Sequence, residues 1–361
     1  MNPPRRVLVI VTRRIGDVLL ATAVIRSLKS AWPDATLDAL VFSSTANVLS
    51  ANADVARIHA IPERPKLLQH IGFIAKLFKR YDLAVSLVPG DRPTIYAYLA
   101  GRTRVGLLLD THKESWKRHF LNHWVAYDLA AKHMVLTYLS VLEPLRVPPV
   151  AEVTASWRDA DQRRAEEMLA PLGNHRYVVL HLYPKFNYKK WSDAGWTALA
   201  RWITEHDLRI VLTGGNDADE VEYVRKLAGG MNAPLNLAGK LSLSESACVL
   251  ARAAAYVGPD TALTHMAAAL GIPTVTLFGP TDPVKWGPWP KGCDASRTPW
   301  RRFGDQALGN VRLLQGRAAC VPCGREGCER HVASFSDCLL QLPPARVIHA
   351  LRAALNEKNI Q

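Results

Sequence analysis

The sequence predicts two α/β domains in tandem, each with a doubly wound parallel sheet. Short apolar runs typical of buried parallel strands alternate with helical patterns along the chain. The alternation pauses once, at a stretch that contains Pro144, Pro148 and Pro149, and then starts again. The length of 361 residues agrees with this interpretation, because a domain takes roughly 150 residues.

The first domain begins with a β-branched run at 5–11 that is apolar on both faces. A helical pattern follows the turn at 15–17 and stops at Pro33, because proline cannot continue a helix. The strand at 36–41 completes a strand-helix-strand unit of the length that a right-handed crossover requires. The other elements expected in this domain are strands at 58–61 and 83–87 and a helix at 67–81.

The second domain repeats this layout. Strands are expected at 177–182, 209–213, 254–258 and 274–279, and helices at 159–172, 192–206 and 344–356. We expect domain boundaries at 1–165 and 166–343, the second domain including a Cys-rich segment at 320–338, with 344–361 as a C-terminal helix that could pack on either domain. In such folds a ligand binds at the carboxyl ends of the strands, here facing the cleft between the two domains.

Composition excludes several classes of protein. Hydrophobic residues make up 48% of the chain, which is too much for a disordered protein. No stretch reaches the roughly 18 uninterrupted apolar residues of a membrane-spanning helix, and no secretory signal stands at the N-terminus. We therefore expect a soluble protein.

The chain is basic, and its positive charge is concentrated in one segment. Residues 57–118 contain 12 Lys/Arg and 5 Asp/Glu, so that +7 of the net charge of +13 lies there. Nucleic acid, an acidic membrane surface and a phosphorylated substrate are the partners that such a segment could bind. A solvated surface without a partner is the plain alternative.

Polar residues follow three of the predicted strands, at the sheet edge where ligands collect in α/β proteins. Asp17 stands at the entry to a helix, where a carboxylate is either a cap or an exposed base. Asp260 and Thr261 stand at a second helix start, and His265 follows about one turn later. Free N–H groups at such a helix start suit a diphosphate. No G-x-G-x-x-G motif follows the first strand, which disfavours a hydride-transfer enzyme.

In their order and spacing, the motifs at 15–20, 26–29, 260–265 and 278–283 resemble those of glycosyltransferase family 9, the ADP-heptose:lipopolysaccharide heptosyltransferases. The resemblance covers nearly the whole chain. It implies a GT-B fold, in which two Rossmann-like domains face a cleft. It also implies an inverting transfer of heptose from ADP-heptose without a catalytic metal.

The resemblance implies roles for individual residues as well. Asp17 matches the general base of the family, and inversion does need one base to deprotonate the acceptor hydroxyl. Lys189 matches a lysine that contacts the donor phosphates, and Lys190 competes with it for this role; their charge would stabilise the leaving ADP. The implied donor-binding residues are Gly16, Lys189, Lys190, Thr213, Asp260, Thr261, Ala262, Leu263, His265 and Gly279.

One donor-site position departs from the family pattern. Ala262 stands where the family usually has glycine. A Cβ there would hinder a close approach of the backbone to the donor if the residue needs a positive φ. The substitution puts the fine geometry of donor binding in question, but not the nucleotide site itself.

The resemblance also gives the basic segment a partner, because family members bind a phosphorylated, Kdo-bearing lipopolysaccharide core on the N-terminal domain. The acceptor-binding residues that we expect are Arg64, Lys66, Arg92, His112, Lys113, Lys117 and Arg118. Such an acceptor implies a cytoplasmic enzyme with peripheral contact at the cytoplasmic face of the inner membrane, and no nucleic-acid partner.

Four of the cysteines, Cys320, Cys323, Cys328 and Cys338, form a C-x2-C-x4-C-x9-C pattern. Four thiols in so short a segment fit a tetrahedral structural site for Zn²⁺ or Fe, and His331 could replace one of them. Disulfides are the main alternative, which a reducing cytosol disfavours. We expect a structural metal.

Three other functions stay open. The chain could transfer heptose to a protein or another glycan, or it could bind ADP-sugars without catalysis. It could also be a metal-containing nucleic-acid-binding protein, although it has no basic helix suited to a groove and no aromatic RNA-binding strand.

Overall fold

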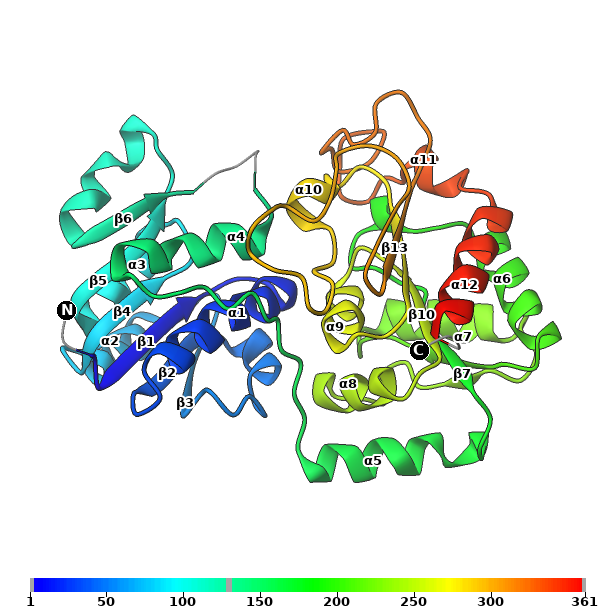
Figure 1. The fold of residues 1–361 in the computed structure, drawn as a ribbon, viewed down its shortest axis with the longest axis horizontal. Coiled ribbons are helices and arrows are strands. Elements are labelled where there is room, and N and C mark those ends of the chain that lie inside the picture. The colour runs from blue at the N-terminus through cyan, green and yellow to red at the C-terminus, as the bar shows by residue number, and fades with distance from the viewer. Residues whose placement is uncertain (1–2, 128–131, 359–361) are drawn as a thin grey trace. The chain divides into compact units, whose positions relative to one another are not determined.

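The fold was examined in a computed structural model that describes residues 3–127 and 132–358. The chain divides into two compact units (Figure 1). The N-terminal unit comprises Met1–Ser156 and Gly292–Thr298, and the C-terminal unit comprises Trp157–Lys291 and Pro299–Gln361. This division places the boundary nine residues before the one expected at 165, and it assigns the last helix to the C-terminal unit.

The N-terminal unit is built on a six-stranded sheet whose strands are all parallel. The strand order is β3-β2-β1-β4-β5-β6, which is the order of a Rossmann sheet. The strands are β1 (Arg6–Val11), β2 (Thr36–Phe42), β3 (Arg57–Ile61), β4 (Tyr81–Ser86), β5 (Gly101–Leu108) and β6 (His123–Ala126). The helices are α1 (Ile15–Ala31), α2 (Leu67–Leu77), α3 (Asp91–Ala100) and α4 (Met134–Leu139), with 3-10 helices η1 (Ser43–Val48), η2 (His112–Phe120) and η3 (Ser140–Leu145).

The sheet of the C-terminal unit runs β12-β13-β11-β10-β7-β8-β9. Read from β9, its first five strands repeat the order of the N-terminal sheet, and β13 and β12 follow. Among the described strands, only β12 is antiparallel to its neighbour. The strands are β7 (Tyr177–His181), β8 (Arg209–Thr213), β9 (Leu235–Asn236), β10 (Ala255–Pro259), β11 (Thr274–Phe278), β12 (Gln306–Leu308) and β13 (Val311–Gln315). The helices are α5 (Asp159–Leu169), α6 (Asp193–Glu205), α7 (Ala218–Ala228), α8 (Leu243–Ala251), α9 (Ala262–Leu270), α10 (Pro283–Trp286), α11 (Asp337–Leu340) and α12 (Pro344–Lys358), with 3-10 helices η4 (Ala170–Leu172) and η5 (Asn187–Lys189).

The central strands form the cores of the two units because they are apolar on both faces. All of β7, β10 and β11 is buried, as is β1 after Arg6. The last helix completes the core of the C-terminal unit, where Val347 and Leu351 pack in one cluster with Trp191 and Trp196. Figure 1 shows α12 beside α6. The helix therefore belongs to this unit, a choice that its amphipathic pattern left open.

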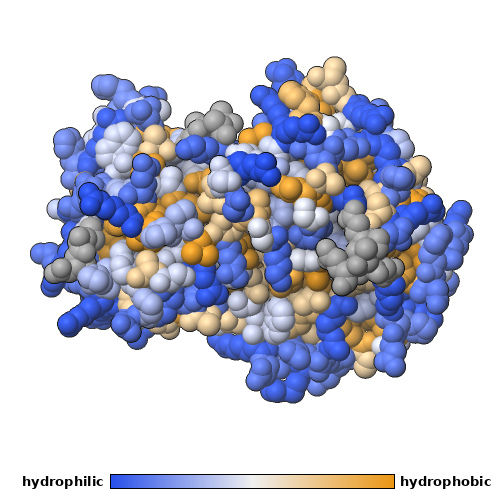
Figure 2. Space-filling model, viewed as in Figure 1, coloured by the Kyte–Doolittle hydropathy of each residue, from blue (hydrophilic) through white to orange (hydrophobic). Residues whose placement is uncertain are grey.

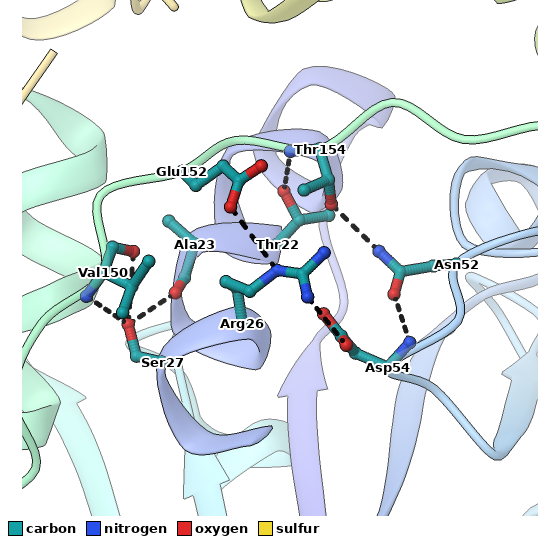
Figure 3. Close-up of polar contacts among 9 residues, drawn as sticks. All are labelled: Thr22, Ala23, Arg26, Ser27, Asn52, Asp54, Val150, Glu152 and Thr154. Carbon is teal, nitrogen blue, oxygen red and sulfur yellow. Dashed lines mark hydrogen bonds and ion pairs between the residues drawn. The ribbon is translucent and has the colours of Figure 1, made fainter. Parts of the chain in front are cut away.

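Two hydroxyl groups on α1 hold the segment that leaves the N-terminal unit (Figure 3). Thr22 Oγ1 accepts a hydrogen bond from the Thr154 N–H at 2.9 Å, and Ser27 Oγ accepts one from the Val150 N–H at 2.8 Å. Between them, Arg26 forms ion pairs with Asp54 at 3.2 Å and with Glu152. An extended segment without a sheet partner thus has its backbone donors satisfied by side chains of α1.

Some predicted elements end elsewhere than expected. The helix expected at 67–81 ends at Leu77, and Lys79 then adopts a left-handed φ of 50° before β4 begins at Tyr81. Among the described residues, no helix has both the length and the apolar character needed to cross a bilayer. The face viewed in Figure 2 mixes hydrophilic and hydrophobic side chains.

Candidate functional site

The predicted site residues lie at the carboxyl ends of parallel strands in each unit. In the N-terminal unit, Asp17 follows β1, and the order of the sheet reverses between β1 and β4. In the C-terminal unit, Lys189 follows β7 and Asp260 follows β10, and the order reverses between those two strands. Ligands of doubly wound sheets bind outside such a switch point. Both units therefore carry predicted site residues where their folds place a ligand.

Asp17 does not cap the helix in which it lies. The N-cap of α1 is Arg14, whose side chain makes no capping bond, and Asp17 is the third helical residue. Its Oδ1 accepts a hydrogen bond of 2.8 Å from the Tyr138 hydroxyl. Arg13 Nε lies 4.0 Å from the same oxygen. The carboxylate is 6% exposed, so it is a nearly buried acid with a defined partner, as a base would be.

Three side chains of the C-terminal unit converge where α9 begins. Lys189 Nζ lies 2.5 Å from Asp260 Oδ2, and His265 Nε2 lies 3.7 Å from Asp260 Oδ1. Burial opposes ionisation of Asp260, but Lys189 and His265 hold its pKa well below the usual value. The buried His265 Nδ1 has no hydrogen-bond partner among the described residues. The cluster thus combines a charged lysine with an imidazole nitrogen that no described group satisfies.

The start of α9 adds backbone donors to this cluster. The N-cap residue Thr261 makes no side-chain capping bond, so its side chain leaves the first N–H groups of the helix available to a ligand. Ala262 and Leu263 are the first two helical residues. Ala262 is not among the described residues with positive φ. Its Cβ therefore brings no backbone strain, and the concern raised by the missing glycine does not apply to φ.

The two adjacent lysines have different surroundings. Lys190 Nζ lies 3.9 Å from the ring centroid of Tyr183 and 4.8 Å from that of Tyr223. Burial lowers the pKa of Lys190, although Asp193 and Asp219 oppose this effect. Lys190 is thus held in an aromatic cage, whereas Lys189 reaches the carboxylate at the start of α9. The geometry favours Lys189 for the role at the donor phosphates.

Thr213 ends β8 and is buried against His181, whose Nδ1 lies 3.2 Å from the Thr213 carbonyl oxygen. Gly215 N–H donates to Glu220 Oε1 at 2.6 Å.

A Cβ on Gly279, just after β11, would lie 2.7 Å from Leu339 Cγ, so packing alone requires that glycine. Gly16 is the second residue of α1 and precedes Asp17 in the N-terminal unit.

The predicted acceptor residues follow β3, β4 and β5 at the sheet edge where Asp17 follows β1. Arg64 and Lys66 follow β3 and are exposed. Arg92 lies in the first turn of α3 and donates to the Glu63 carbonyl oxygen at 2.8 Å. His112 and Lys113 begin η2 and are exposed. These five side chains keep surface that an anionic acceptor could contact.

Lys117 and Arg118 are bound to other residues of the unit. Lys117 is 1% exposed, pairs with Asp91 at 2.6 Å and also pairs with Glu114. Arg118 pairs with Asp110 at 2.5 Å, and its guanidinium carbon lies 4.2 Å from the centroid of the Trp124 ring. The burial of Lys117 leaves it no surface for direct contact with an acceptor.

The four cysteines of the C-x2-C-x4-C-x9-C pattern are all free thiols. Burial raises the pKa of Cys338 to about 12, and the charges of Cys328, Cys323 and Cys320 act in the same direction. The Asp337 N–H lies 3.4 Å from Cys328 Sγ. Within 3–127 and 132–358, no group of three or more His, Cys, Asp or Glu side chains is arranged to hold a metal. The metal therefore stays a prediction.

Several side chains that contact these sites were not predicted as site residues, although Tyr138 lies in a segment that resembles the family. Tyr138 is 121 residues from Asp17 in the chain, so no local pattern could pair them. Tyr127, whose hydroxyl lies 3.4 Å from Met134 Sδ, is also a neighbour of Arg13. Glu220 accepts the Gly215 N–H and was not among the predicted site residues. The Gly214-Gly215 pair was the one signal that could have drawn attention to it.

Solved structures show the fold. The chain matches the structure of an Escherichia coli ADP-heptose lipopolysaccharide heptosyltransferase II with a TM-score of 0.77 and 20% identity, over 98% of this chain and 99% of that one. It also matches an iron-containing dodecameric glycosyltransferase, TibC, from enterotoxigenic E. coli, with a TM-score of 0.52 and 15% identity, over 98% of this chain and 76% of that one. The predicted GT-B fold is thereby confirmed.

The family follows from sequence. A model of glycosyltransferase family 9 (heptosyltransferase) matches residues 79–300. Over 287 residues the chain is 33% identical to lipopolysaccharide heptosyltransferase 3 of E. coli, covering 76% of this chain and 83% of that protein. The chain belongs to glycosyltransferase family 9, and the prediction that it is a glycosyltransferase is confirmed.

Proposed function

We propose that this chain transfers a heptose from ADP-heptose to a phosphorylated lipopolysaccharide core, with inversion and without a catalytic metal. The observation that carries the proposal is the start of α9 at the switch point of the C-terminal sheet, which the Thr261 side chain does not cap. Lys189 lies beside it, and His265 Nδ1 has no partner within the part of the chain that the structure describes. Free N–H groups and a lysine are the donors that a diphosphate needs.

The donor phosphates would compete with Asp260 for Lys189. In the structure, Lys189 Nζ is bound to Asp260 by a hydrogen bond of 2.5 Å. A diphosphate at the start of α9 would share that ammonium group and accept from backbone N–H groups. When the bond between the sugar and the phosphate breaks, the phosphate oxygen keeps the electron pair. These donors would stabilise the resulting charge.

Asp17 is the general base in this proposal. It would take the proton of an acceptor hydroxyl while that oxygen forms a bond to the anomeric carbon, on the face opposite to the leaving ADP. A nearly buried carboxylate that makes no helix cap is suited to this role. The name of the E. coli relative, a lipopolysaccharide heptosyltransferase, supports the choice of acceptor.

The proposal is tested with ADP-heptose and a panel of truncated lipopolysaccharide cores, with product detection by mass spectrometry. We expect transfer to a phosphorylated core and a loss of roughly 10²- to 10⁴-fold for Asp17→Asn, with ADP affinity retained in calorimetry. Asp38→Asn is the matched control, because Asp38 is also a buried acid bonded to a tyrosine. Full activity of Asp17→Asn would remove Asp17 from the base role.

The same panel separates the proposal from its alternatives. A product formed only on a protein or on another glycan would replace the lipopolysaccharide acceptor. ADP-heptose binding without turnover on any acceptor would indicate a non-catalytic relative. The proposal places the enzyme in the cytoplasm.

We also propose that the four cysteines hold a structural Zn²⁺ or Fe ion. Four thiols are a donor set suited to either metal, and an N–H group directed at Cys328 Sγ is a contact that favours a thiolate. The iron-containing TibC glycosyltransferase shares the fold. Elemental analysis of protein purified under reducing conditions tests the site, and absence of both metals would contradict it.

Peripheral contact with an anionic membrane is proposed on the surface of the N-terminal unit. Trp116 is 43% exposed and Tyr98 is 44% exposed, and Arg104 stacks on Tyr98. Aromatic side chains beside cations suit a lipid interface. We expect the protein to sediment with phosphatidylglycerol vesicles, and Trp116→Ala to weaken this binding. Equal sedimentation of the variant would contradict the assignment.

A further inference from the structure

The hydroxyl of Tyr138 makes the closest described contact to the proposed base. We infer that Tyr138 is a positioning residue for Asp17: it fixes Oδ1 and leaves Oδ2 to receive the acceptor proton. The inference rests on the proposed function, in which Asp17 is the base. Tyr138 itself would touch neither the donor nor the acceptor, since it is 1% exposed.

The contact between the two side chains is short and isolated from solvent. Tyr138 Oη lies 2.8 Å from Asp17 Oδ1, and both residues are buried. Tyr138 and Arg13 both approach the same carboxylate oxygen, Oδ1. A carboxylate held through one oxygen keeps its plane and its rotamer while the other oxygen stays open. This is the arrangement that a base needs when it takes a proton from a bound hydroxyl.

The helix that carries Tyr138 is fixed at its start. His133 is the N-cap of α4, and its Nδ1 accepts the Val135 N–H at 3.1 Å. His133 and Met134 are fully buried, and α4 packs against α1. The phenol is therefore presented to Asp17 by a buried, capped turn rather than by a loop.

The hydrogen bond has one possible direction. Burial and the charge of Asp17 raise the pKa of Tyr138 well above its ordinary value. The phenol keeps its proton at any working pH, so it donates to Asp17 and does not compete for the proton of the acceptor. Donation to the charged carboxylate favours the form of Asp17 that acts as a base.

Two other titratable side chains face Asp17. Arg13 lies 4.0 Å away with a side chain that is 45% exposed. Burial opposes the charge of Arg13, but Asp17, Tyr138 and Tyr127 raise its pKa overall. Tyr127 is buried, and burial and the charge of Asp17 raise its pKa while Arg13 opposes them. Because Arg13 is distant and half exposed, Tyr138 is the group that fixes the carboxylate.

The test is Tyr138→Phe, which removes one oxygen and keeps the ring. We expect kcat to fall about tenfold, the effect of losing one hydrogen bond in the transition state, with little change in KM for ADP-heptose. The acid limb of the pH–rate profile should move to higher pH, because the carboxylate loses a donor that favours its charged form. Site-specific 3-fluorotyrosine, a stronger donor, should move the limb the other way.

Tyr81→Phe is the matched control. Tyr81 is a buried tyrosine of the same unit, and its hydroxyl donates to Asp38 Oδ2 at 2.7 Å. We expect this variant to lose stability without moving the acid limb. If Tyr138→Phe leaves both kcat and the limb unchanged, or if Tyr81→Phe moves the limb equally, Tyr138 does not position the base. If Asp17→Asn retains transfer, the base assignment has failed, and with it the basis of this inference.

Discussion

Neighbouring residues of one type can have different tasks, as Lys189 and Lys190 show. The sequence presents them as an undifferentiated pair before a tryptophan. The structure directs Lys189 to Asp260 and places Lys190 over the rings of Tyr183 and Tyr223. At the end of a single 3-10 turn, one lysine reaches a carboxylate and the next lies over aromatic rings.

We therefore expect Lys189→Met and Lys190→Met to differ. Loss of Lys189 should weaken ADP binding at least tenfold in calorimetry, because a charge-assisted bond is lost and Asp260 is left to repel the diphosphate. Loss of Lys190 should lower the free energy of unfolding by about 1 kcal/mol through the cation–π contacts, with ADP affinity within threefold of the parent. The reverse pattern would assign the phosphate contact to Lys190.

His181 gives the C-terminal unit a pH-dependent stability. Burial lowers the pKa of His181 to about 4, against a weaker opposing effect of the Thr213 carbonyl. The unfolded chain binds a proton near pH 6.5, so the folded state is fully favoured above that pH and loses stability as the pH falls from 6.5 towards 4.

We expect protonation linked to His181 to lower the free energy of unfolding by about 2 kcal/mol between pH 7 and pH 5. Urea unfolding at the two pH values measures it. His181→Gln should reduce the difference in unfolding free energy between the two pH values. His206→Gln, which changes an exposed histidine, is the control and should keep the difference of the parent. An equal loss in parent and His181→Gln would show that another group causes the acid sensitivity.

Helices and strands were predicted best where one spacing of apolar residues dominates the sequence. The strand at 5–11 was predicted within a residue, because β1 is apolar after Arg6. The helix after it begins at Ile15, inside the turn expected at 15–17, and ends at Ala31, before Pro33. The strands β5 and β6 escaped prediction because their exposed or half-buried residues, such as Arg102 and His123, interrupt the apolar run. The contact of Asp17 with Tyr138 was beyond sequence reasoning for a different cause, since it joins two elements far apart in the chain.

The hydrogen bonds from α1 to the segment at 150–154 can be tested by mutation. Ser27→Ala should leave the Val150 N–H without its acceptor, which costs about 1–3 kcal/mol for a buried donor. Hydrogen exchange at residues 148–155 should accelerate. Ser44→Ala, which removes an exposed hydroxyl from η1, should leave that exchange unchanged. Equal acceleration in both variants would show that the hydroxyl of Ser27 does not hold the segment.

Internal ion pairs neutralise part of the positive charge of the basic segment. Lys117 and Arg118 neutralise acids of their own unit, whereas Arg64, Lys66 and Lys113 are exposed. The second group keeps surface that a phosphorylated acceptor could contact. Composition could not distinguish internal ion pairs from available cations, because that distinction depends on tertiary contacts.

The triple variant Arg64→Gln, Lys66→Gln, Lys113→Gln should raise the acceptor KM about tenfold or more and weaken its dependence on salt. ADP affinity should stay the same. A control triple of equal charge change on exposed residues of the C-terminal unit, Arg163→Gln, Arg201→Gln and Lys226→Gln, should change neither. If both triples raise the KM alike, only the total charge matters.

The short piece Gly292–Thr298 belongs to the N-terminal unit although C-terminal sequence flanks it on both sides. On a ribosome, the rest of the N-terminal unit emerges long before this piece does. The unit therefore stays incomplete until most of the C-terminal sheet has been translated. Strands β7, β8, β10 and β11 all precede this piece in the order of synthesis.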